Sequence, residues 1–403
     1  GTNAAITLRE KKNLIPKTYE SLKGSMFIDS VLLHSPLLLH PSTNRREGHF
    51  EEVFENPIPN LRLNNNDFYC YPAKIGTLLA FVYFHKDFVF SGISLSNIFE
   101  PATTEDLAVT KPDIIITFGV KDEKDDMVFY NDTENDVVVA KLSYNPKLEY
   151  FGYMKKIMLT CYNVAMMNKG NLPIHGAMVN VYFRNGTKRG VVFMGDSGAG
   201  KSEIIEEITN LGGQEIDNID VIFDDMGVFR ISDSGNVVAQ GTEIGAFVRL
   251  DDLDRSLPYQ AMDRSIFMNP ESTTNARVII PVTDYKTVSS DHEVDYFLYA
   301  NNYEPKEGVQ LYDKVHDAKD IFIEGKRMAK GTTHEKGITH SFFANPFGPL
   351  QQEDKARKLI DEFWNVLDDT KVDVGEVYTN LGLDDRTDES LKNAARAVLD
   401  LIQ

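Results

Sequence analysis

The residue types best suited to bind phosphate occur together in one glycine-rich segment. The segment consists of Gly195, Asp196, Ser197, Gly198, Ala199, Gly200, Lys201 and Ser202. It follows an apolar run at residues 190–194 and precedes a helix-like stretch from Glu203, so the expected order is strand, loop, helix. Glycines let successive backbone N–H groups turn toward one point, and a helix N-terminus adds partial positive charge there. Lys201 is placed to reach terminal phosphates, and the Ser202 hydroxyl to bind a divalent metal. The segment predicts a nucleoside triphosphate site; the alternative is a plain glycine-rich turn.

Two adjacent carboxylates, Asp224 and Asp225, follow an apolar run at residues 221–223. We expect this run to be a strand that ends at the two acids. A carboxylate at the end of such a strand, downstream of a phosphate loop, is suited to hold magnesium, because hard cations prefer oxygen ligands. Adjacent acids at a strand end are otherwise typical of a solvated turn, so it is the preceding loop that favours the metal interpretation.

His175 and the pair Lys155-Lys156 are ambiguous when each is considered by itself. A single histidine at the start of an apolar strand is more often a satisfied core residue than a ligand. Paired lysines on a helix ordinarily lie at the surface. Both gain a functional interpretation only together with the surrounding motifs.

The overall composition excludes several classes of protein. A chain of 403 residues with 42% hydrophobic residues can build two full cores. A net charge of −19 argues against nucleic acid or an anionic membrane as a general partner. Cys70 and Cys161 match no zinc or redox spacing, which favours a reducing compartment. The longest apolar run near the N-terminus, residues 31–39, is interrupted and too short to span a bilayer. We expect a cytoplasmic protein, and the sequence leaves the oligomeric state open.

The apolar patterns predict a mixed α/β protein of two domains, residues 1–170 and 171–403. In the first, residues 78–84 and 113–118 indicate buried strands, and a helical spacing begins at Met154. In the second, strands are expected at residues 177–183, 190–194, 220–223, 227–231, 237–240, 277–282 and 294–300. Helical faces recur around residues 356–367 and 391–402. So many strands around one glycine loop favour a largely antiparallel α+β core over alternating βαβ units.

Several motifs between about residues 150 and 350 resemble those of the ATP-using phosphoenolpyruvate carboxykinases, and they run in the family's order. Residues 150–158 resemble Y-x-G-x-M-K-K, residues 174–181 the family's histidine strand, and residues 195–202 its phosphate loop. Residues 223–227 resemble G-D-D-E, residues 275–282 N-T-R-V-x-Y-P-I, and residues 297–302 F-L-T-A-D-A. Residues 330–338 and 343–348 resemble its G-T-E-x-G-I and F-x-x-x-F-G pieces. The resemblance implies that family's two-domain fold, with the phosphate loop in a mixed-sheet C-terminal domain.

The resemblance also implies roles for individual residues. Lys156, His175 and Asp225 would hold manganese, and Ser202 the magnesium of the nucleotide. Lys156 must be neutral to be a ligand, and the cation and Lys155 would lower its pKa. Arg277 would bridge the transferred phosphoryl group and the enolate, and Tyr150 would face the carboxylate or CO2 end of the substrate. The implied catalytic set is Tyr150, Lys155, Lys156, His175, Lys201, Asp224, Asp225 and Arg277.

The implied reaction is that of a gluconeogenic carboxy-lyase: oxaloacetate loses CO2, and the enolate oxygen takes the γ-phosphate to form phosphoenolpyruvate. ATP is the expected nucleotide, with GTP not excluded. Two family features have no clear match. The arginine that grips the substrate carboxylate has no motif here, although Arg9, Arg45, Arg46 and Arg62 are available. The adenine-packing segments are absent, because residues 377–382 run directly into the final helix.

A second resemblance, to HPr kinase/phosphorylase, competes with the first. The Gly-Lys-Ser-Glu ending at residues 200–203 and the closely spaced His-Gly strand are nearer to that kinase. In this interpretation Asp224 or Asp225 would act as general base on a serine or small-molecule hydroxyl, with His175 nearby. The lysine pair and residues 275–282 have no role there, which favours the carboxykinase. A third alternative is a nucleotide sensor without catalysis.

Overall fold

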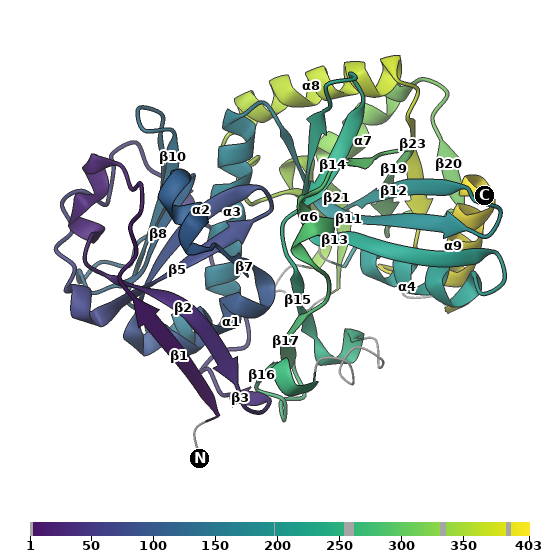
Figure 1. Ribbon diagram of the computed structural model, residues 1–403. Coiled ribbons are helices and arrows are strands. Elements are labelled where there is room, and N and C mark those ends of the chain that lie inside the picture. The colour runs from purple at the N-terminus through teal and green to yellow at the C-terminus, as the bar shows by residue number, and fades with distance from the viewer. Residues whose placement is uncertain (1–2, 197, 254–261, 331–335, 384–387) are drawn as a thin grey trace. The chain divides into compact units, whose positions relative to one another are not determined.

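The computed structural model describes residues 3–196, 198–253, 262–330, 336–383 and 388–403 (Figure 1). The chain forms two compact units. Unit 1 comprises residues 1–165 and 242–285, and unit 2 comprises residues 166–241 and 286–403. The chain therefore leaves unit 1, returns to it for one segment, and leaves it again. Residues 242–285, with Arg277 among them, pack within unit 1.

Unit 1 is built around a mixed nine-stranded sheet. Its order is β1 (Ala4–Arg9), β2 (Met26–Leu33), β5 (Phe68–Ile75), β6 (Leu78–His85), β8 (Ile114–Val120), β10 (Val137–Ser143), β9 (Met127–Asp132) and β4 (Glu51–Glu52), with β7 (Glu100–Pro101) beside β5. The two central strands β6 and β8 are buried along their whole length. Apolar residues occupy every position of such strands when both faces of a sheet are covered.

The described residues up to 168 also form helical segments. They are η1 (Lys17–Leu22), η2 (Asn65–Asp67), η3 (Lys86–Phe88), α1 (Val89–Ile98), α2 (Thr104–Val109), η4 (Pro146–Glu149) and α3 (Gly152–Asn168). Tyr19 and Leu22 of η1 and Leu107 of α2 join one core cluster with alternate residues of β5 and β6. A smaller sheet has the order β15 (Gly245–Arg249), β17 (Arg277–Pro281), β16 (Ile266–Met268) and β3 (Leu37–Leu39). Thus β3 pairs with β16, a strand more than 200 residues later in the chain.

Unit 2 contains an eight-stranded mixed sheet. The order is β18 (His292–Glu293), β14 (Val237–Gly241), β13 (Ile216–Ile231), β11 (Leu172–Phe183), β12 (Lys188–Met194), β19 (Tyr296–Asn301), β23 (Asp373–Tyr378) and β20 (Val309–Leu311). Strands β12, β19 and β23 are mutually parallel, whereas the strands on either side of them pair antiparallel. The carboxyl ends of these three parallel strands therefore lie at one edge of the sheet.

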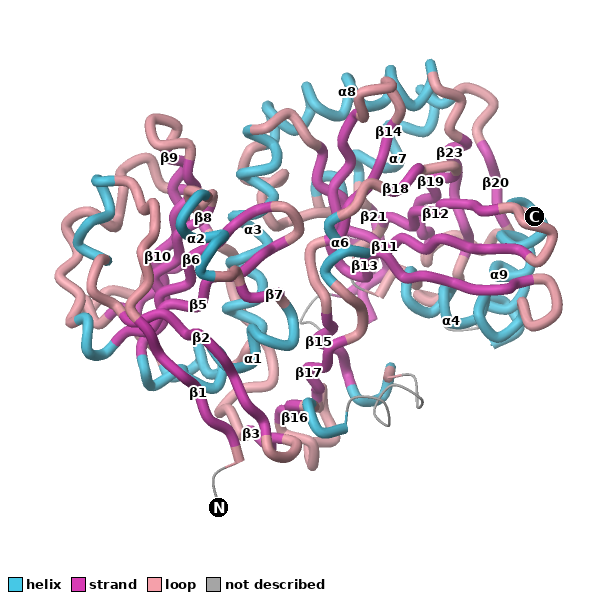
Figure 2. Tube along the Cα trace, viewed as in Figure 1, coloured by secondary structure: helices cyan, strands magenta, loops and turns pink. Residues whose placement is uncertain are grey.

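Helices cover both faces of this second sheet (Figures 1 and 2). Helices α4 (Lys201–Leu211) and α9 (Asp388–Ile402) bury their apolar residues against one face. On the other face, Trp364 of α8 (Glu353–Asp369) packs on Phe297 of β19 and Phe322 of α7 (Lys319–Glu324). The remaining elements are η5 (Leu250–Asp252), η6 (Met262–Arg264), α6 (Tyr285–Ser289), η7 (Val315–Ala318), β21 (Lys326–Lys330), β22 (Lys336–His340) and η8 (Phe342–Ala344).

The expectation of a mixed α/β protein is confirmed. The helical faces around residues 356–367 and 391–402 are α8 and α9, and the strand before the glycine loop is β12. One expectation is wrong: Asp224 and Asp225 do not close a strand. They lie inside the continuous strand β13. Asp224 pairs with Ala177 and Asp225 with Gly176 of β11, and the pairing of the two strands continues on both sides of the acids. Across the described residues, we find no helix with the length and apolar character needed to span a membrane.

Candidate phosphate and metal site

The glycine loop, residues 195–202, joins the end of β12 to the start of α4 (Figure 1). Gly195 N–H donates to the His175 carbonyl oxygen at 3.0 Å, which ties the start of the loop to β11. Gly198 and Gly200 adopt φ angles of 81° and 108°, which side-chain-bearing residues rarely adopt. Helix α4 begins at Lys201, two residues before the helix-like stretch expected from the sequence. Ser197, an expected contact, lies outside the described residues.

Close packing of two strands brings His175 to this loop. Gly176 on β11 lies opposite Met194, the last residue of β12. A Cβ atom at Gly176 would lie 2.2 Å from the Phe193 carbonyl oxygen, so only glycine fits between the strands. On its other side Gly176 pairs with Asp225 of β13. The antiparallel register of β11 with β12 and β13 therefore gathers the histidine, the acids and the loop at one end of the sheet.

Three of the expected site residues are in contact here. The Asp225 Oδ1 atom lies 3.2 Å from His175 Nε2 and 3.5 Å from Lys201 Nζ. His175 and Lys201 are buried, and Asp225 is partly buried. Asp225 has a φ of 137°, a strained value for a residue with a side chain. Strain of this kind is concentrated at functional sites, where the surrounding structure maintains it.

The protonation state of His175 makes this cluster suitable for a cation. Nδ1 lies 2.7 Å from the Ala344 carbonyl oxygen, to which it donates its hydrogen. Burial, followed by the charge of Lys201, lowers the pKa of His175, so the ring is neutral near pH 7. A neutral ring that donates from Nδ1 presents a lone pair at Nε2. This lone pair faces the Asp225 carboxylate, and two electron-rich atoms at this separation fit a bound metal ion.

Asp224 and Ser202 form a second pair of oxygen groups. Ser202 Oγ donates to Asp224 Oδ1 at 2.9 Å, and both side chains are exposed to solvent. A serine hydroxyl at the start of a helix and a carboxylate are the oxygen ligands that Mg²⁺ takes in nucleotide sites. The geometry thus fits a hydrated magnesium ion next to the glycine loop.

A further ion pair at the loop was not anticipated from the sequence. The Asp196 carboxylate lies 3.4 Å from Arg327 Nε of β21 and 3.7 Å from His175 Nδ1. Asp196 was expected only as a loop contact, and Arg327 had no expected role. No spacing in the sequence connects these two residues, since they are 131 positions apart. Their pairing places the positive charge of Arg327 beside the loop, in addition to that of Lys201.

The other expected site residues lie in unit 1, where Tyr150 and Arg277 are neighbours. The Tyr150 and Phe247 ring centroids are 5.6 Å apart, and the Arg277 guanidinium stacks 4.8 Å above the same Phe247 ring. Arg277 donates to the Phe247 carbonyl and to Asn275 Oδ1, both at 3.1 Å. Burial raises the pKa of Tyr150, while Arg277 and a hydrogen bond with Asn275 lower it. Tyr150 therefore stays a neutral hydroxyl beside a fixed positive charge.

Arg46 belongs to the same group in unit 1. The positive charge of Arg46 lowers the pKa of Tyr150. Burial lowers the pKa of the Arg46 guanidinium, and the hydroxyls of Tyr153 and Tyr150 raise it. Arg46 also lies 5.4 Å from the Phe50 ring centroid. The other three arginines considered from the sequence, Arg9, Arg45 and Arg62, have no described contact with Tyr150. Of the four arginines, Arg46 is thus the one whose charge acts on Tyr150.

Helix α3 carries the lysine pair. Lys155 forms a buried ion pair with Glu243, with Nζ 3.3 Å from Oε2. Glu243 had no expected role, and its contact with Lys155 depends on the return of the chain to unit 1. Lys156 is partly buried on the same helix, and its backbone carbonyl accepts the Thr160 hydroxyl at 2.8 Å. Within the described residues, no three His, Cys, Asp or Glu side chains are grouped so that they could hold a metal ion. His175 and Asp225 belong to unit 2, and Lys156 belongs to unit 1.

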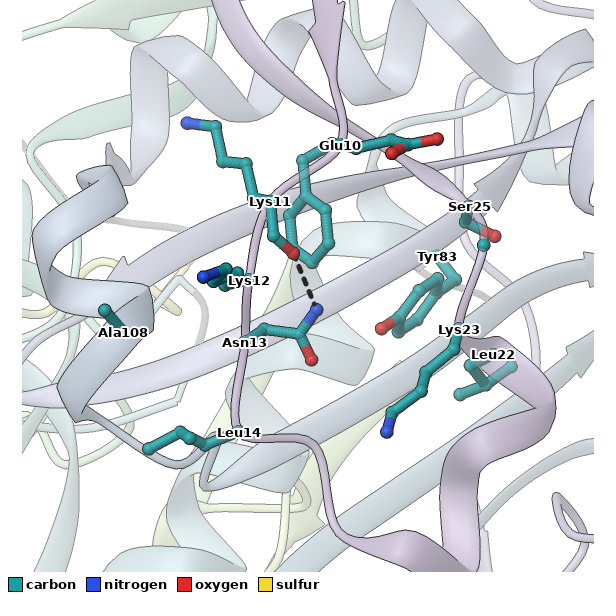
Figure 3. Close-up of a pocket in the computed structure, with 12 residues that line it drawn as sticks. Glu10, Lys11, Lys12, Asn13, Leu14, Leu22, Lys23, Ser25, Tyr83 and Ala108 are labelled. Carbon is teal, nitrogen blue, oxygen red and sulfur yellow. Dashed lines mark hydrogen bonds between the residues drawn. The ribbon is translucent and has the colours of Figure 1, made fainter.

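Unit 1 also contains a hollow of about 630 Å³ (Figure 3), and none of the residues just described lines it. The extended segment 10–14 forms one wall, and Lys23, Phe27, Tyr83 and Ala108 contribute to the others. Lys11 in this wall is already paired with Asp29 at 2.7 Å. The hollow is lined by none of the residues with an expected role, so it does not bear on the phosphate chemistry.

Comparison with known proteins adds no assignment, because the chain matches no protein-family model and no curated protein.

Proposed function

We propose that this chain is a phosphoenolpyruvate carboxykinase-like enzyme, which uses a nucleoside triphosphate to convert oxaloacetate to phosphoenolpyruvate and CO2. The observation that best supports this function is the group Tyr150, Arg277 and Arg46 in unit 1. It combines a neutral phenol with two guanidinium groups, the set needed to bind a dicarboxylate substrate. A kinase for a simple hydroxyl has no use for such a group.

The glycine loop and its neighbours would supply the phosphoryl-transfer half of this reaction. Backbone N–H groups of the loop and the amino end of α4 would bind the β- and γ-phosphates, with Lys201 at the terminal phosphate. Asp225 lies 3.5 Å from Lys201 and orients its ammonium group before the nucleotide binds. ATP is the expected nucleotide, and GTP fits the same phosphate contacts.

Two cations fit the donor atoms present. Ser202 and Asp224 would hold the magnesium ion of the nucleotide, and His175 and Asp225 would bind manganese. Lys156 as a further ligand is what the resemblance to the carboxykinases implies. When bound, these cations supply positive charge that offsets the negative charge on the phosphates and on the substrate oxygens. The hydrogen bond from His175 Nδ1 to Ala344 fixes the ring with Nε2 as the ligand atom.

The chemical steps proposed here are those that the resemblance to the carboxykinases implies. The bond between the carboxylate carbon and C3 of oxaloacetate breaks, CO2 leaves, and the electron pair becomes an enolate. The enolate oxygen then forms a bond to the γ-phosphorus while the bond from that phosphorus to the ADP oxygen breaks. Arg277 would stabilise the negative charge on the enolate and the phosphoryl group, and Tyr150 would donate a hydrogen bond to the departing carboxylate end.

A hydroxyl kinase similar to HPr kinase/phosphorylase is the second candidate. The contact that favours it is the 3.2 Å approach of His175 Nε2 to Asp225, which is also the arrangement of a general base beside a histidine. In that reaction Asp225 would take the proton of a serine or small-molecule hydroxyl as its oxygen attacks the γ-phosphorus. Lys156 and Arg277 would have no part in it.

A coupled assay for phosphoenolpyruvate formation tests the proposal. The assay contains oxaloacetate, Mg²⁺ and Mn²⁺, with ATP and GTP in parallel. We expect Lys156→Ala to lower kcat by about 100-fold or more, because a first ligand of the metal is lost. Lys169→Ala is the matched control, since Lys169 is an exposed lysine just after α3.

The two candidates give different results in this assay. Turnover that requires manganese and disappears in Lys156→Ala supports the carboxykinase. Absence of turnover by the wild-type protein, with ATP binding intact, rejects it. ATP consumption with magnesium alone and a hydroxyl acceptor, unaffected by Lys156→Ala, favours the kinase.

A further inference from the structure

Two buried side chains from distant parts of the chain donate hydrogen bonds to backbone carbonyl groups of the glycine loop. Thr379 Oγ1 donates to the Ala199 carbonyl oxygen at 2.8 Å, and Asn302 Nδ2 donates to the Gly198 carbonyl oxygen at 3.1 Å. Both side chains are fully buried. They lie 180 and 104 positions from their partners in the sequence, and neither belongs to the glycine-rich motif.

The parallel strands of unit 2 explain how these residues reach the loop. Asn302 is the first residue after β19, and Thr379 is the first after β23. Strands β12, β19 and β23 are neighbours in this order and run parallel, so their carboxyl ends meet at one edge. Thr379 N–H donates to the Asn301 carbonyl at 2.9 Å and keeps the two strand ends together beyond the sheet. The loop after β12 therefore rests on the ends of the next two strands.

Asn302 also fixes strand β21 to the loop. Its Oδ1 accepts the Met328 N–H at 2.8 Å, and its Nδ2 donates to the Met328 carbonyl at 3.1 Å. One side-chain amide thus holds the backbone of β21 and of the loop together. The neighbouring residue Arg327 adds the ion pair with Asp196. Strand β21 is therefore connected to the loop through two separate contacts.

The contact of Thr379 has a direct consequence for the amide that follows. In a planar trans peptide the N–H points opposite to the C=O, so a hydrogen bond to Ala199 O turns the Gly200 N–H away from Thr379. Gly200 also packs against Thr379, since a Cβ atom there would lie 2.7 Å from Thr379 Cγ2. Its φ of 108° completes the turn into α4. One threonine thus sets both the direction of this amide and the space beside it.

We propose that Asn302 and Thr379 are positioning residues that hold the glycine loop in its phosphate-binding conformation before a nucleotide arrives. The inference rests on the proposed nucleotide chemistry for its functional consequence, but not for the loop geometry itself. A loop ordered during folding loses less conformational entropy on binding, so its affinity for phosphate is higher. Neither residue would touch the nucleotide; both act through the backbone carbonyls of Gly198 and Ala199.

The test compares variants at Thr379 with a matched variant elsewhere in unit 2. Thr379→Val removes only the hydroxyl and keeps the shape, and Thr379→Ser restores a hydroxyl. Thr370→Val is the control, because Thr370 Oγ1 makes the same type of bond, to Val366 O at 2.7 Å, at the C-terminal end of helix α8. Asn302→Asp serves as a second variant, since it removes the donor to Gly198. The fluorescence of Trp364, the only tryptophan and a buried residue of unit 2, verifies that each variant is folded.

Two measurements are made on each variant. Hydrogen exchange of peptides covering residues 195–202 is followed in the ligand-free protein, and ATP binding is measured by calorimetry with Mg²⁺. We expect Thr379→Val and Asn302→Asp to speed exchange in these peptides and to weaken ATP binding by about three- to tenfold. Thr379→Ser should recover most of both properties, and Thr370→Val should resemble the wild type.

The outcomes separate this inference from the proposed function. Unchanged exchange and affinity in both Thr379→Val and Asn302→Asp would overturn the positioning role, as would equal effects in Thr370→Val. If the wild-type protein binds no ATP, the proposed function fails. In that case faster loop exchange in Thr379→Val alone still supports the positioning role, and unchanged exchange overturns it.

Discussion

Asp225 illustrates how the proposed chemistry is supported by single residues. Its backbone holds a φ of 137° in the middle of strand β13, where any residue with a side chain is strained. Its carboxylate contacts both Lys201 and His175. Lys201 and Asp225 offset each other's charge, and the neutral His175 ring adds a lone pair beside them, so the group is suited to phosphate and metal together.

Arg46 is the residue for which the structure makes the sharpest residue-scale prediction. Arg46→Ala should raise the KM for oxaloacetate by about tenfold or more and change kcat less, because a guanidinium–carboxylate contact is made already in the ground state. The measurement is steady-state kinetics at saturating ATP. Arg45→Ala provides the control, since Arg45 is exposed and pairs with Glu47 at 3.2 Å. Equal KM values in the two variants would exclude Arg46 from substrate binding.

His85 makes the stability of unit 1 dependent on pH. It is buried, and its Nδ1 accepts the Asp87 N–H at 3.1 Å at the start of η3. Burial lowers the pKa of His85; Asp87 and Asp67 oppose this effect, and Lys121 and Lys86 add to it. Because the unfolded chain then binds a proton more readily, stability is complete above the ordinary histidine pKa of about 6.5 and declines as pH falls below it.

The corresponding measurement is the urea midpoint of unfolding, followed by circular dichroism, at about pH 7.5 and pH 5.5. His85→Asn keeps an acceptor for the Asp87 N–H and cannot titrate, so its midpoint should change less between the two pH values than that of the wild type. The exposed residue His34 supplies the control variant His34→Asn. A midpoint that falls equally with and without His85 would show that other groups determine the pH dependence.

At the scale of elements, the close approach of β11 and β12 is the feature on which the site depends most. Gly176→Ala would place a methyl group 2.2 Å from the Phe193 carbonyl, and this contact is backbone that cannot move aside without parting the strands. We expect a loss of about 2–3 kcal/mol in the free energy of unfolding, read from Trp364 fluorescence. Gly213→Ala is the control, since a Cβ atom there meets nothing within 4 Å. A Gly176→Ala variant as stable as this control would contradict the packing described.

Elements with a strong local pattern could be predicted from the sequence, and elements defined by distant pairing could not. Helices α8 and α9 bury one regular apolar face each, and the strand–loop–helix order around Gly195 is a local property. By contrast, β3 pairs with β16, and this contact depends on the return of residues 242–285 to unit 1. From the sequence alone, Asp224 and Asp225 of β13 are predicted to end a strand. Their pairing with β11 continues the strand, and this pairing involves residues more than 40 positions away in the chain.

The same distinction applies to the candidate site. The loop residues, Asp224, Asp225 and His175 belong to recognisable segments, and the structure brings them together within unit 2. Asn302, Thr379 and Arg327 carry no motif of their own. They reach the loop because the order of parallel strands places their ends beside it, and that order is a property of the folded sheet.

For the whole molecule, the net charge of −19 would slow the association of the proposed nucleotide. The protein and ATP repel each other at long range, and salt screens this repulsion. We expect the association rate constant of a fluorescent ATP analogue to rise about two- to fivefold between low and physiological ionic strength at fixed Mg²⁺, measured by stopped flow. A rate constant that falls with added salt would show that the positive field of Lys201 and Arg327 dominates instead.

The central claim concerns the fate of the γ-phosphate, which phosphorus NMR follows directly. The wild-type protein is mixed with ATP, oxaloacetate, Mg²⁺ and Mn²⁺, and spectra are recorded over time. We expect a phosphoenolpyruvate resonance that grows in step with ADP and is absent without oxaloacetate. ADP accompanied by inorganic phosphate alone, or ATP that binds and remains intact, would contradict it.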